Sequence, residues 1–149
     1  MNRRITLIDK VAGRFHGIQT LFLSNNYIKE LGQISQFSSL RTLSLSHNNI
    51  ESVKELIVKL ADCETLENLR VDGNPAMEYT PLAFARLVVG LPQLKFLDGT
   101  AITQQLRKDF HDILQKEDAT LDTLVQNTQA IESLGLATSA DESFEFFRD

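Results

Sequence analysis

A motif of apolar residues at fixed spacing recurs along the chain and constrains its fold more than any other feature. Residues 18–28, IQTLFLSNNYI, match residues 40–50, LRTLSLSHNNI, at every apolar position of the motif, 22 residues apart. Residues 66–76, LENLRVDGNPA, form a third copy 26 residues further on, and a degenerate fourth copy begins at Leu94 within residues 91–102. A repeat of this length cannot bury its apolar side alone, so successive copies must stack around a shared core.

Alternation within each copy distinguishes the two sides of a short strand. The fourth and sixth positions are apolar and are expected to point into the core, while the residues between them point outward. The inward pairs are Leu21 and Leu23, Leu43 and Leu45, and Leu69 and Val71. Asn26, Asn48 and Asn74 share the ninth position, where an amide can satisfy backbone groups of neighbouring turns that would otherwise be buried without partners. These asparagines are expected to form a structural ladder along a parallel sheet.

The segments between the copies predict tight turns and short helices. Apolar residues recur at every third position through residues 28–40, which is typical of 3₁₀ geometry. The apolar residues Val53, Leu56, Ile57 and Leu60 fit one face of an α-helix. Ile5, Ile8 and Val11 show the same spacing as residues 28–34. This first segment is therefore either a minimal N-terminal cap, together with Arg3 and Arg4, or the continuation of repeats that precede residue 1.

A further helix is predicted after the third copy. Thr80-Pro81 is typical of an N-cap followed by proline at the first helical position, and Gly90 with Pro92 is typical of a helix end. The buried face expected for this helix consists of Leu82, Ala85, Val88 and Val89.

The pattern LxxLxLxxNxI is the leucine-rich-repeat signature, and the 22-residue spacing resembles the short-repeat members found in eukaryotic cells. Residues 74–103 are similar to the C-terminal cap shared by the U2 snRNP A-prime protein, axonemal dynein light chain 1 and several centrosomal and ciliary proteins. Asn74-Pro75, Leu91-Pro92 and Leu97-Asp98-Gly99 match that cap. The resemblance implies an α/β solenoid with about four strands in a curved parallel sheet and a 3₁₀ or helical convex side. It also implies a non-enzymatic adaptor that holds a partner against the concave sheet.

Outward-facing strand residues are the candidates for partner contact. Phe22 stands out, because an aromatic ring at an exposed strand position is unfavourable unless something covers it. Aromatic and arginine side chains are the usual interface hot spots. The candidate binding residues are Phe22, Arg41, His47, Arg70 and Phe96. The alternative is that Phe22 packs on the N-terminal segment and that the polar residues are only solvated.

Catalytic and metal chemistry are not expected. Ser46, His47 and Asp72 lie one repeat apart, but an open sheet offers no sheltered pocket with oxyanion donors. His16, His47 and His111 belong to different elements without metal-ligand spacing, so neither a metal nor a cofactor is predicted. The one cysteine, Cys63, excludes an internal disulfide and is expected to be a small buried apolar residue.

The C-terminal part of the chain differs from the repeats in charge and pattern. Residues 1–100 hold 11 basic against 10 acidic side chains, whereas residues 101–149 hold 4 against 10. Apolar spacing predicts amphipathic helices over 103–117 and 119–134, the second ended by Gly135. We expect the first to dock on the cap, and the second to cap the solenoid, bind a partner or form a homodimer. The expected division is a repeat domain over 1–103, a helical extension over 104–135, and an acidic tail over 136–149. The tail contains Phe144, Phe146 and Phe147 and is expected to be either a short docking motif or a disordered end.

The function expected from these features is protein binding, with a cytoskeletal, ciliary or centrosomal assembly as the expected setting. Two alternatives remain: a ribonucleoprotein component that reaches RNA through a protein, since the near-neutral repeats disfavour direct nucleic-acid contact, and a regulatory subunit of a phosphatase or GTPase. No stretch of the sequence is apolar enough to predict a membrane span or a signal peptide, so a cytoplasmic location is expected, with the nucleus as the alternative.

Overall fold

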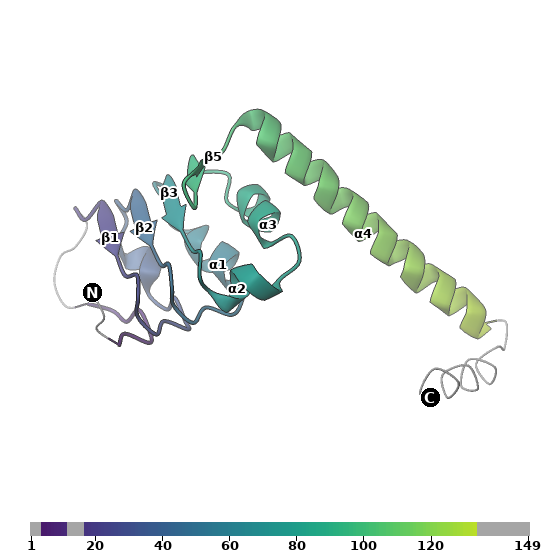
Figure 1. Ribbon diagram of the computed structural model, residues 1–149, viewed down its shortest axis with the longest axis horizontal. Helices are drawn as coiled ribbons and strands as arrows, with labels where there is room; N and C mark the ends of the chain where they lie inside the picture. Colours follow the sequence, from purple (N-terminus) through teal and green to yellow (C-terminus); the bar gives the residue numbers. More distant parts are fainter. Residues whose placement is uncertain (1–3, 12–16, 134–149) are drawn as a thin grey trace. The chain divides into compact units, whose positions relative to one another are not determined.

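The computed structural model describes residues 4–11 and 17–133 of the chain, and its centre is one sheet of five strands in chain order. The first four strands pair in parallel, and the fifth pairs antiparallel with the fourth. Figure 1 shows the strands side by side. They are β1 (Thr20–Phe22), β2 (Thr42–Ser44), β3 (Asn68–Arg70), β4 (Phe96–Leu97) and β5 (Thr100–Ala101). The predicted α/β solenoid with about four parallel strands is confirmed.

The antiparallel strand β5 was not predicted, and two residues explain it. Asp98 and Gly99 both have positive φ, 50° and 82°. Such a pair reverses the chain in a tight turn, which glycine permits without steric cost. The Ile102 N–H then donates to the Lys95 carbonyl at 2.8 Å, which closes the hairpin. The parallel stack therefore ends with a strand that returns along β4.

The register of the sheet aligns one apolar residue from each repeat. Leu21 pairs with Leu43, Leu43 with Leu69, and Leu69 with Leu97. The last three are fully buried, whereas Leu21 is only partly buried because it lies at the open end of the row. Each fully buried leucine contributes about 1.5–3 kcal/mol relative to exposure, so this row is a main source of the solenoid's stability.

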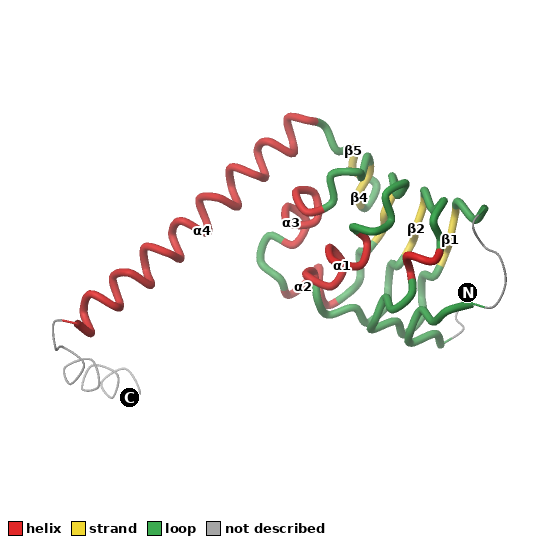
Figure 2. The backbone as a smooth tube through the Cα atoms, turned by 180° about the vertical axis from the view of Figure 1, so that it is seen from behind, coloured by secondary structure: helices red, strands yellow, loops and turns green. Residues whose placement is uncertain are grey.

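The connecting segments pack on the other side of the core (Figure 2). The apolar residues at every third position through 28–40 are all buried, and a 3₁₀ turn, η1 (Ile34–Gln36), lies among them. Helix α1 (Val53–Leu60) begins where Ser52 accepts a hydrogen bond from the Glu55 N–H at 3.1 Å. Both predictions from spacing are confirmed. Residues 4–11 add a preceding turn, because the Ile5 and Thr6 carbonyls accept from the backbone of Tyr27 and Lys29.

The cap region contains two short helices where one was predicted. Helix α2 (Pro75–Tyr79) has Pro75 in its first turn, and α3 (Ala83–Gly90) begins after Leu82, whose φ is 55°. The prediction that Pro81 is the first residue of the helix was wrong. Leu82 adopts a left-handed conformation, so the helix begins only at Ala83. Leu82 is consequently exposed, not buried. The buried face consists of Ala83, Ala85, Leu87 and Val88.

One long helix, α4 (Gln104–Ser133), replaces the two predicted C-terminal helices. Residues 104–133 contain neither glycine nor proline, so nothing in the backbone requires a break near residue 118. The Thr120 and Thr123 hydroxyls donate to the Lys116 and Ala119 carbonyls, as threonines do within a continuous helix. Gly135 and the tail 136–149 lie outside the described residues.

The chain divides into two compact units at His111. The first includes the repeats, the cap and the beginning of α4, and the second starts at Asp112. Within residues 4–11 and 17–133, no helix is both long and apolar enough to span a membrane.

Candidate binding face

The strands place the five candidate residues on the outward side of the sheet or at its margins. Phe22 is 62% exposed and Phe96 is 45% exposed, and Arg41, His47 and Arg70 are also exposed. Most of the Phe22 ring is therefore open to solvent. The sheet therefore presents two aromatic rings and two guanidinium groups to solvent, which is a composition favourable to protein contact.

Register brings two of these residues into one row. Phe22 pairs with Ser44, and Ser44 pairs with Arg70. Two strand spacings separate Phe22 from Arg70, which is about 10 Å. Phe96 belongs to the neighbouring row, opposite Asn68. Arg41 and His47 lie outside β2. Arg41 comes immediately before its first residue, and His47 follows its last residue, Ser44, by three positions.

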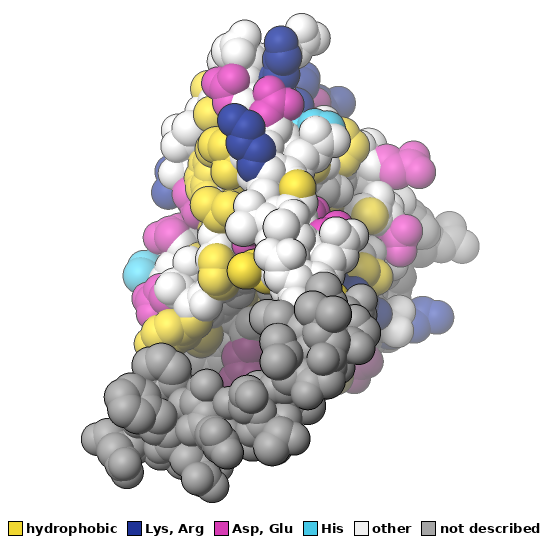
Figure 3. Space-filling view, turned by 90° about the vertical axis from the view of Figure 1, so that its right-hand side faces the viewer, with side chains coloured by type: hydrophobic (Ala, Val, Ile, Leu, Met, Phe, Trp, Pro, Cys, Tyr) yellow, Lys and Arg dark blue, Asp and Glu magenta, His cyan; other side chains and the backbone are white. Residues whose placement is uncertain are grey.

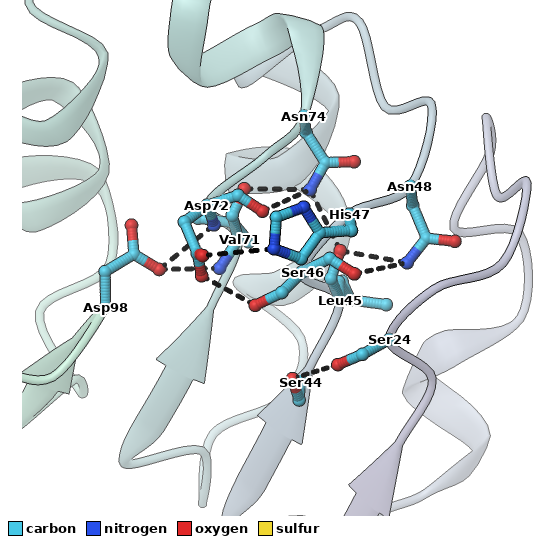
Figure 4. Close-up of polar contacts among 10 residues, drawn as sticks. All are labelled: Ser24, Ser44, Leu45, Ser46, His47, Asn48, Val71, Asp72, Asn74 and Asp98. Atoms are coloured by element: carbon cyan, nitrogen blue, oxygen red, sulfur yellow. Dashed lines mark hydrogen bonds and ion pairs between the residues drawn. The ribbon is translucent and has the colours of Figure 1, made fainter. Parts of the chain in front are cut away.

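Ser44, expected from the strand alternation to point outward, is buried, and so is Ser46. The Ser44 and Ser24 hydroxyls lie 2.5 Å apart, and the Ser46 hydroxyl donates to Asp72 Oδ1 at 2.6 Å (Figure 4). Ser44, which pairs with Phe22 and Arg70 of the adjacent strands, is 6% exposed, and Ser46 is 7% exposed. Contact with a partner falls to the larger side chains around them.

Asp72 lies between Ser46 and His47, which is the wrong order for nucleophilic catalysis. Its other carboxylate oxygen is 3.8 Å from His47 Nε2. A serine nucleophile needs the imidazole, not the carboxylate, as its hydrogen-bond partner, because the base must take the hydroxyl proton. The three side chains instead hold one another in place at the end of two strands, as Figure 4 shows.

His47 also has a structural constraint of its own. Its φ is 55°, and Gly73, at the equivalent place in the next repeat, has a φ of 74°. The imidazole packs against this glycine so closely that a Cβ on Gly73 would lie 2.3 Å from His47 Nδ1. The ring is therefore held at the surface in a defined position, and Gly73 is required both by its backbone conformation and by the ring.

The three ladder asparagines make hydrogen bonds of one kind. The Ile5, Ile28 and Ile50 N–H groups donate to the side-chain oxygens of Asn26, Asn48 and Asn74, at 3.1–3.2 Å. Each side-chain nitrogen in turn donates to carbonyls of its own turn: Leu23 for Asn26, Leu45 for Asn48, and Val71 for Asn74. Asn48 and Asn74 also donate to a carbonyl of the preceding repeat. These amides connect successive turns through otherwise buried backbone groups.

Asp98, which the sequence indicated only as part of the cap, also supports this face. Its Oδ1 accepts from the Val71 N–H at 2.7 Å and from the Asp72 N–H at 3.2 Å. Burial raises the pKa of Asp98, the two backbone hydrogen bonds oppose this, and the nearby charge of Asp72 adds to it. The signal that could have revealed it is the Asp-Gly pair directly after the last strand leucine, a common turn sequence.

Replacing Asp98 by asparagine is expected to stabilise the protein at neutral pH. Asparagine keeps an oxygen acceptor for both N–H groups but carries no charge to desolvate. Since the pKa of Asp98 is raised in the folded state, the carboxyl costs stability as the pH rises from below its ordinary value through its folded value. Thermal unfolding at pH 7 should therefore give a higher Tm for Asp98→Asn than for wild type, with the difference shrinking as the pH falls below 4 or so. Asp98→Ala, which loses the acceptor, is expected to lower Tm; a lower Tm for Asp98→Asn at pH 7 would contradict the argument.

Cys63 is buried in the core, as predicted. Burial and the charge of Asp62 raise the pKa of its thiol to about 11, so the thiol is protonated and unreactive at neutral pH. Among the described residues, no group of three or more His, Cys, Asp or Glu side chains is arranged to hold a metal ion.

Comparison with known proteins identifies the repeat. Residues 16–58 match the family model described as Leucine Rich repeats (2 copies). The chain therefore contains leucine-rich repeats. One chain of the Drosophila melanogaster SNF/U2A' complex covers 81% of this protein, over 84% of its own length, with a TM-score of 0.62 and 19% identity. This likeness shows a shared solenoid fold.

Two relatives extend the comparison in sequence. The Mycosarcoma maydis U2 small nuclear ribonucleoprotein A' is 32% identical over 113 residues, which is 74% of this chain and 45% of the relative. The Drosophila melanogaster dynein axonemal assembly factor 1 homolog is 33% identical over 91 residues, which is 57% of this chain and 6% of the relative. This leucine-rich-repeat chain thus spans less than half the length of either relative.

Proposed function

We propose that this leucine-rich-repeat protein is a non-catalytic adaptor whose concave face binds a helix or peptide of a partner protein. The observation that carries the proposal is Phe22, a large apolar side chain left open on a sheet whose neighbouring outward residues are polar. A partner that covers this ring gains the free energy of burying an aromatic side chain. Arg70 in the same row adds a hydrogen-bond donor suited to a carboxylate.

The spacing of these two residues describes the partner. Phe22 and Arg70 lie about 10 Å apart across the sheet. Residues seven apart on an α-helix are separated by about the same distance, 10.5 Å along its axis. A partner helix crossing the strands would therefore place an apolar residue on Phe22 and an acidic residue seven positions away on Arg70, with Phe96 available to a second apolar residue.

Capture of partners from the source cells tests the proposal. We expect wild-type chain to retain a partner that Phe22→Ala binds at least tenfold more weakly, since loss of an aromatic hot spot costs about 2 kcal/mol or more. Tyr79→Ala is the matched control, because Tyr79 is an aromatic residue 80% exposed in α2 and outside this face. Charge reversal at Arg41 and at Arg70 should weaken the same complex. Equal retention by wild type and Phe22→Ala, with Tyr79→Ala also unchanged, would refute the concave site.

The assembly in which the adaptor acts has two candidates. One relative is named a dynein axonemal assembly factor, which supports a ciliary or cytoskeletal setting in the cytoplasm. Another is named a small nuclear ribonucleoprotein component, which supports a nuclear particle in which RNA is reached through a protein partner. A regulatory subunit of a phosphatase or GTPase would use the same face and differ only in its partner.

Measuring the RNA that co-purifies with the captured complex separates these settings. A ribonucleoprotein role predicts that RNA co-purifies with the wild-type chain and is lost both with Phe22→Ala and when the protein partner is removed by high salt. A ciliary role predicts an RNA-free complex. Salt-sensitive binding of RNA to the isolated chain would overturn the indirect route, because direct phosphate contacts weaken as salt rises.

A further inference from the structure

The second compact unit carries an exposed apolar stripe that the proposed function does not use. Among the described side chains of residues 112–127 in α4, four large apolar ones are 43–57% exposed: Ile113, Leu121, Leu124 and Val125. At 100° per residue these positions fall on one side of the helix. Figure 3 shows hydrophobic and acidic side chains lying next to each other on the surface of the molecule.

The same segment of α4 carries mostly negative charge. Between residues 112 and 133 there are five acidic side chains and one basic one, Lys116. Glu117 lies one helical turn from both Ile113 and Leu121, and so falls within the apolar stripe. Asp118 lies beside it. The stripe therefore combines apolar side chains with negative charge at Glu117 and Asp118.

We propose that residues 112–127 of α4 form a second docking surface, and that its occupant is a cationic amphipathic helix of a partner protein. The apolar side of that helix would cover Leu121 and Val125, and its lysine or arginine side chains would face Glu117 and Asp118. Helix-in-groove and helix-on-helix recognition works through such regularly spaced anchors, and charge complementarity selects the partner.

Charge disfavours a second copy of this chain as the occupant. Pairing two copies of this segment brings together two helices that each carry a net charge of −4 between residues 112 and 133. In a parallel pair in register, Glu117 would face its own copy within the apolar seam, where like charges are costly. A basic helix removes both penalties. The homodimer expected as one option from the sequence is therefore an outcome that the experiment must be able to detect.

The experiment uses the full chain and two labelled peptide probes. The first is a helical peptide of about 20 residues with leucine along one face and lysine beside it, and the second has glutamate in place of each lysine. Fluorescence anisotropy is expected to show the lysine probe binding at least about tenfold more tightly than the glutamate probe. Its affinity should fall as the salt concentration rises from about 0.05 to 0.5 M, because screening shortens the range of charge interactions.

Matched variants locate the probe on the stripe. Leu121→Ser and Asp118→Lys should each weaken the lysine probe about five- to tenfold. Ala119→Ser and Asp112→Lys, both exposed and turned away from the stripe, are the controls and should leave the affinity unchanged. Circular dichroism checks that each variant keeps its helix content. Phe22→Ala should also bind the lysine probe normally, so failure of the concave site and failure of this one are distinguishable.

Several results would overturn the proposal. Equal affinity for the two probes would remove the role of charge, and unchanged affinity in both Leu121→Ser and Asp118→Lys would remove the site. A dimer in analytical ultracentrifugation that Leu121→Ser dissociates would make a second copy the occupant. A tenfold gain in probe affinity on replacing Phe144, Phe146 and Phe147 by serine would make the chain's own tail the occupant.

Discussion

Asn48→Ala is expected to destabilise the protein by about 3–5 kcal/mol, because each buried polar group left without a partner costs about 1–3 kcal/mol. The substitution removes the acceptor of the Ile28 N–H and the donor to the Leu23 and Leu45 carbonyls. These backbone groups belong to two successive repeats, and alanine offers them neither a hydrogen bond nor access to water. With a total stability of about 5–15 kcal/mol for a domain of this size, the loss is a large part of what holds the fold.

Urea unfolding, followed by circular dichroism, measures this effect. The neighbouring residue supplies the control, because Asn49 is half-buried and its side chain is not part of the ladder. Asn49→Ala keeps the backbone hydrogen bond from its own N–H to the Ile28 carbonyl and should change stability by about 0.5 kcal/mol or less. If Asn48→Ala and Asn49→Ala unfolded at the same urea concentration, the ladder would have no special energetic role.

Arg107→Gln is expected to cost about 2–4 kcal/mol and to loosen the end of the cap, since hydrogen bonds to charged groups contribute about 1.5–3 kcal/mol each. The guanidinium donates to the carbonyls of Val88, Leu91 and Leu94, the last at 2.5 Å. Helix α3 ends at Gly90, so these carbonyls include groups that lack a partner within the helix. Burial lowers the pKa of Arg107, which records that the charge is held partly away from water. Glutamine is too short to reach all three oxygens.

Unfolding in urea and hydrogen exchange of the α3 amides report this loss. Lys108→Gln is the matched control, because Lys108 is exposed and the substitution removes the same charge one residue along α4. Arg107→Lys should fall between the wild type and Arg107→Gln, since an ammonium keeps the charge but not the planar fork. Loss of protection in α3 alone would show that the beginning of α4 secures the cap. Wild-type protection in Arg107→Gln would disprove it.

Much of the fold could be predicted because it depends on spacing along the chain. The 22- and 26-residue intervals place Leu43, Leu69 and Leu97 opposite one another. Any fold that buries these residues must stack the repeats in parallel, and the asparagine at the ninth position then lies beside the backbone it bonds. The outward exposure of Phe22 follows from the alternation of inward and outward residues along each strand, so the candidate face could be predicted from the sequence.

The remaining features depend on contacts between residues distant in sequence, and only the tertiary structure decided them. Ser44 is buried because register places Phe22 and Arg70 on either side of it, and spacing alone does not reveal how deep a short side chain lies between two long ones. In the sequence, Arg107 is indistinguishable from the other charged residues of an amphipathic helix. Its hydrogen bonds to the Val88 and Leu94 carbonyls form only because α4 begins beside the end of α3.

Local backbone conformation could not be predicted from the sequence where two conformations are close in energy. Thr80-Pro81 fits a helix start, but Leu82 adopts a left-handed conformation and the helix begins after it. Residues 104–133 fit two helices or one, and the absence of a helix-breaking residue permits the single helix of the structure. The sequence by itself thus determined the repeat, its core and its ladder, because these depend on the spacing of residues along the chain. The tertiary structure decided which polar side chains are buried and how the solenoid ends, because those depend on neighbours that only folding brings together.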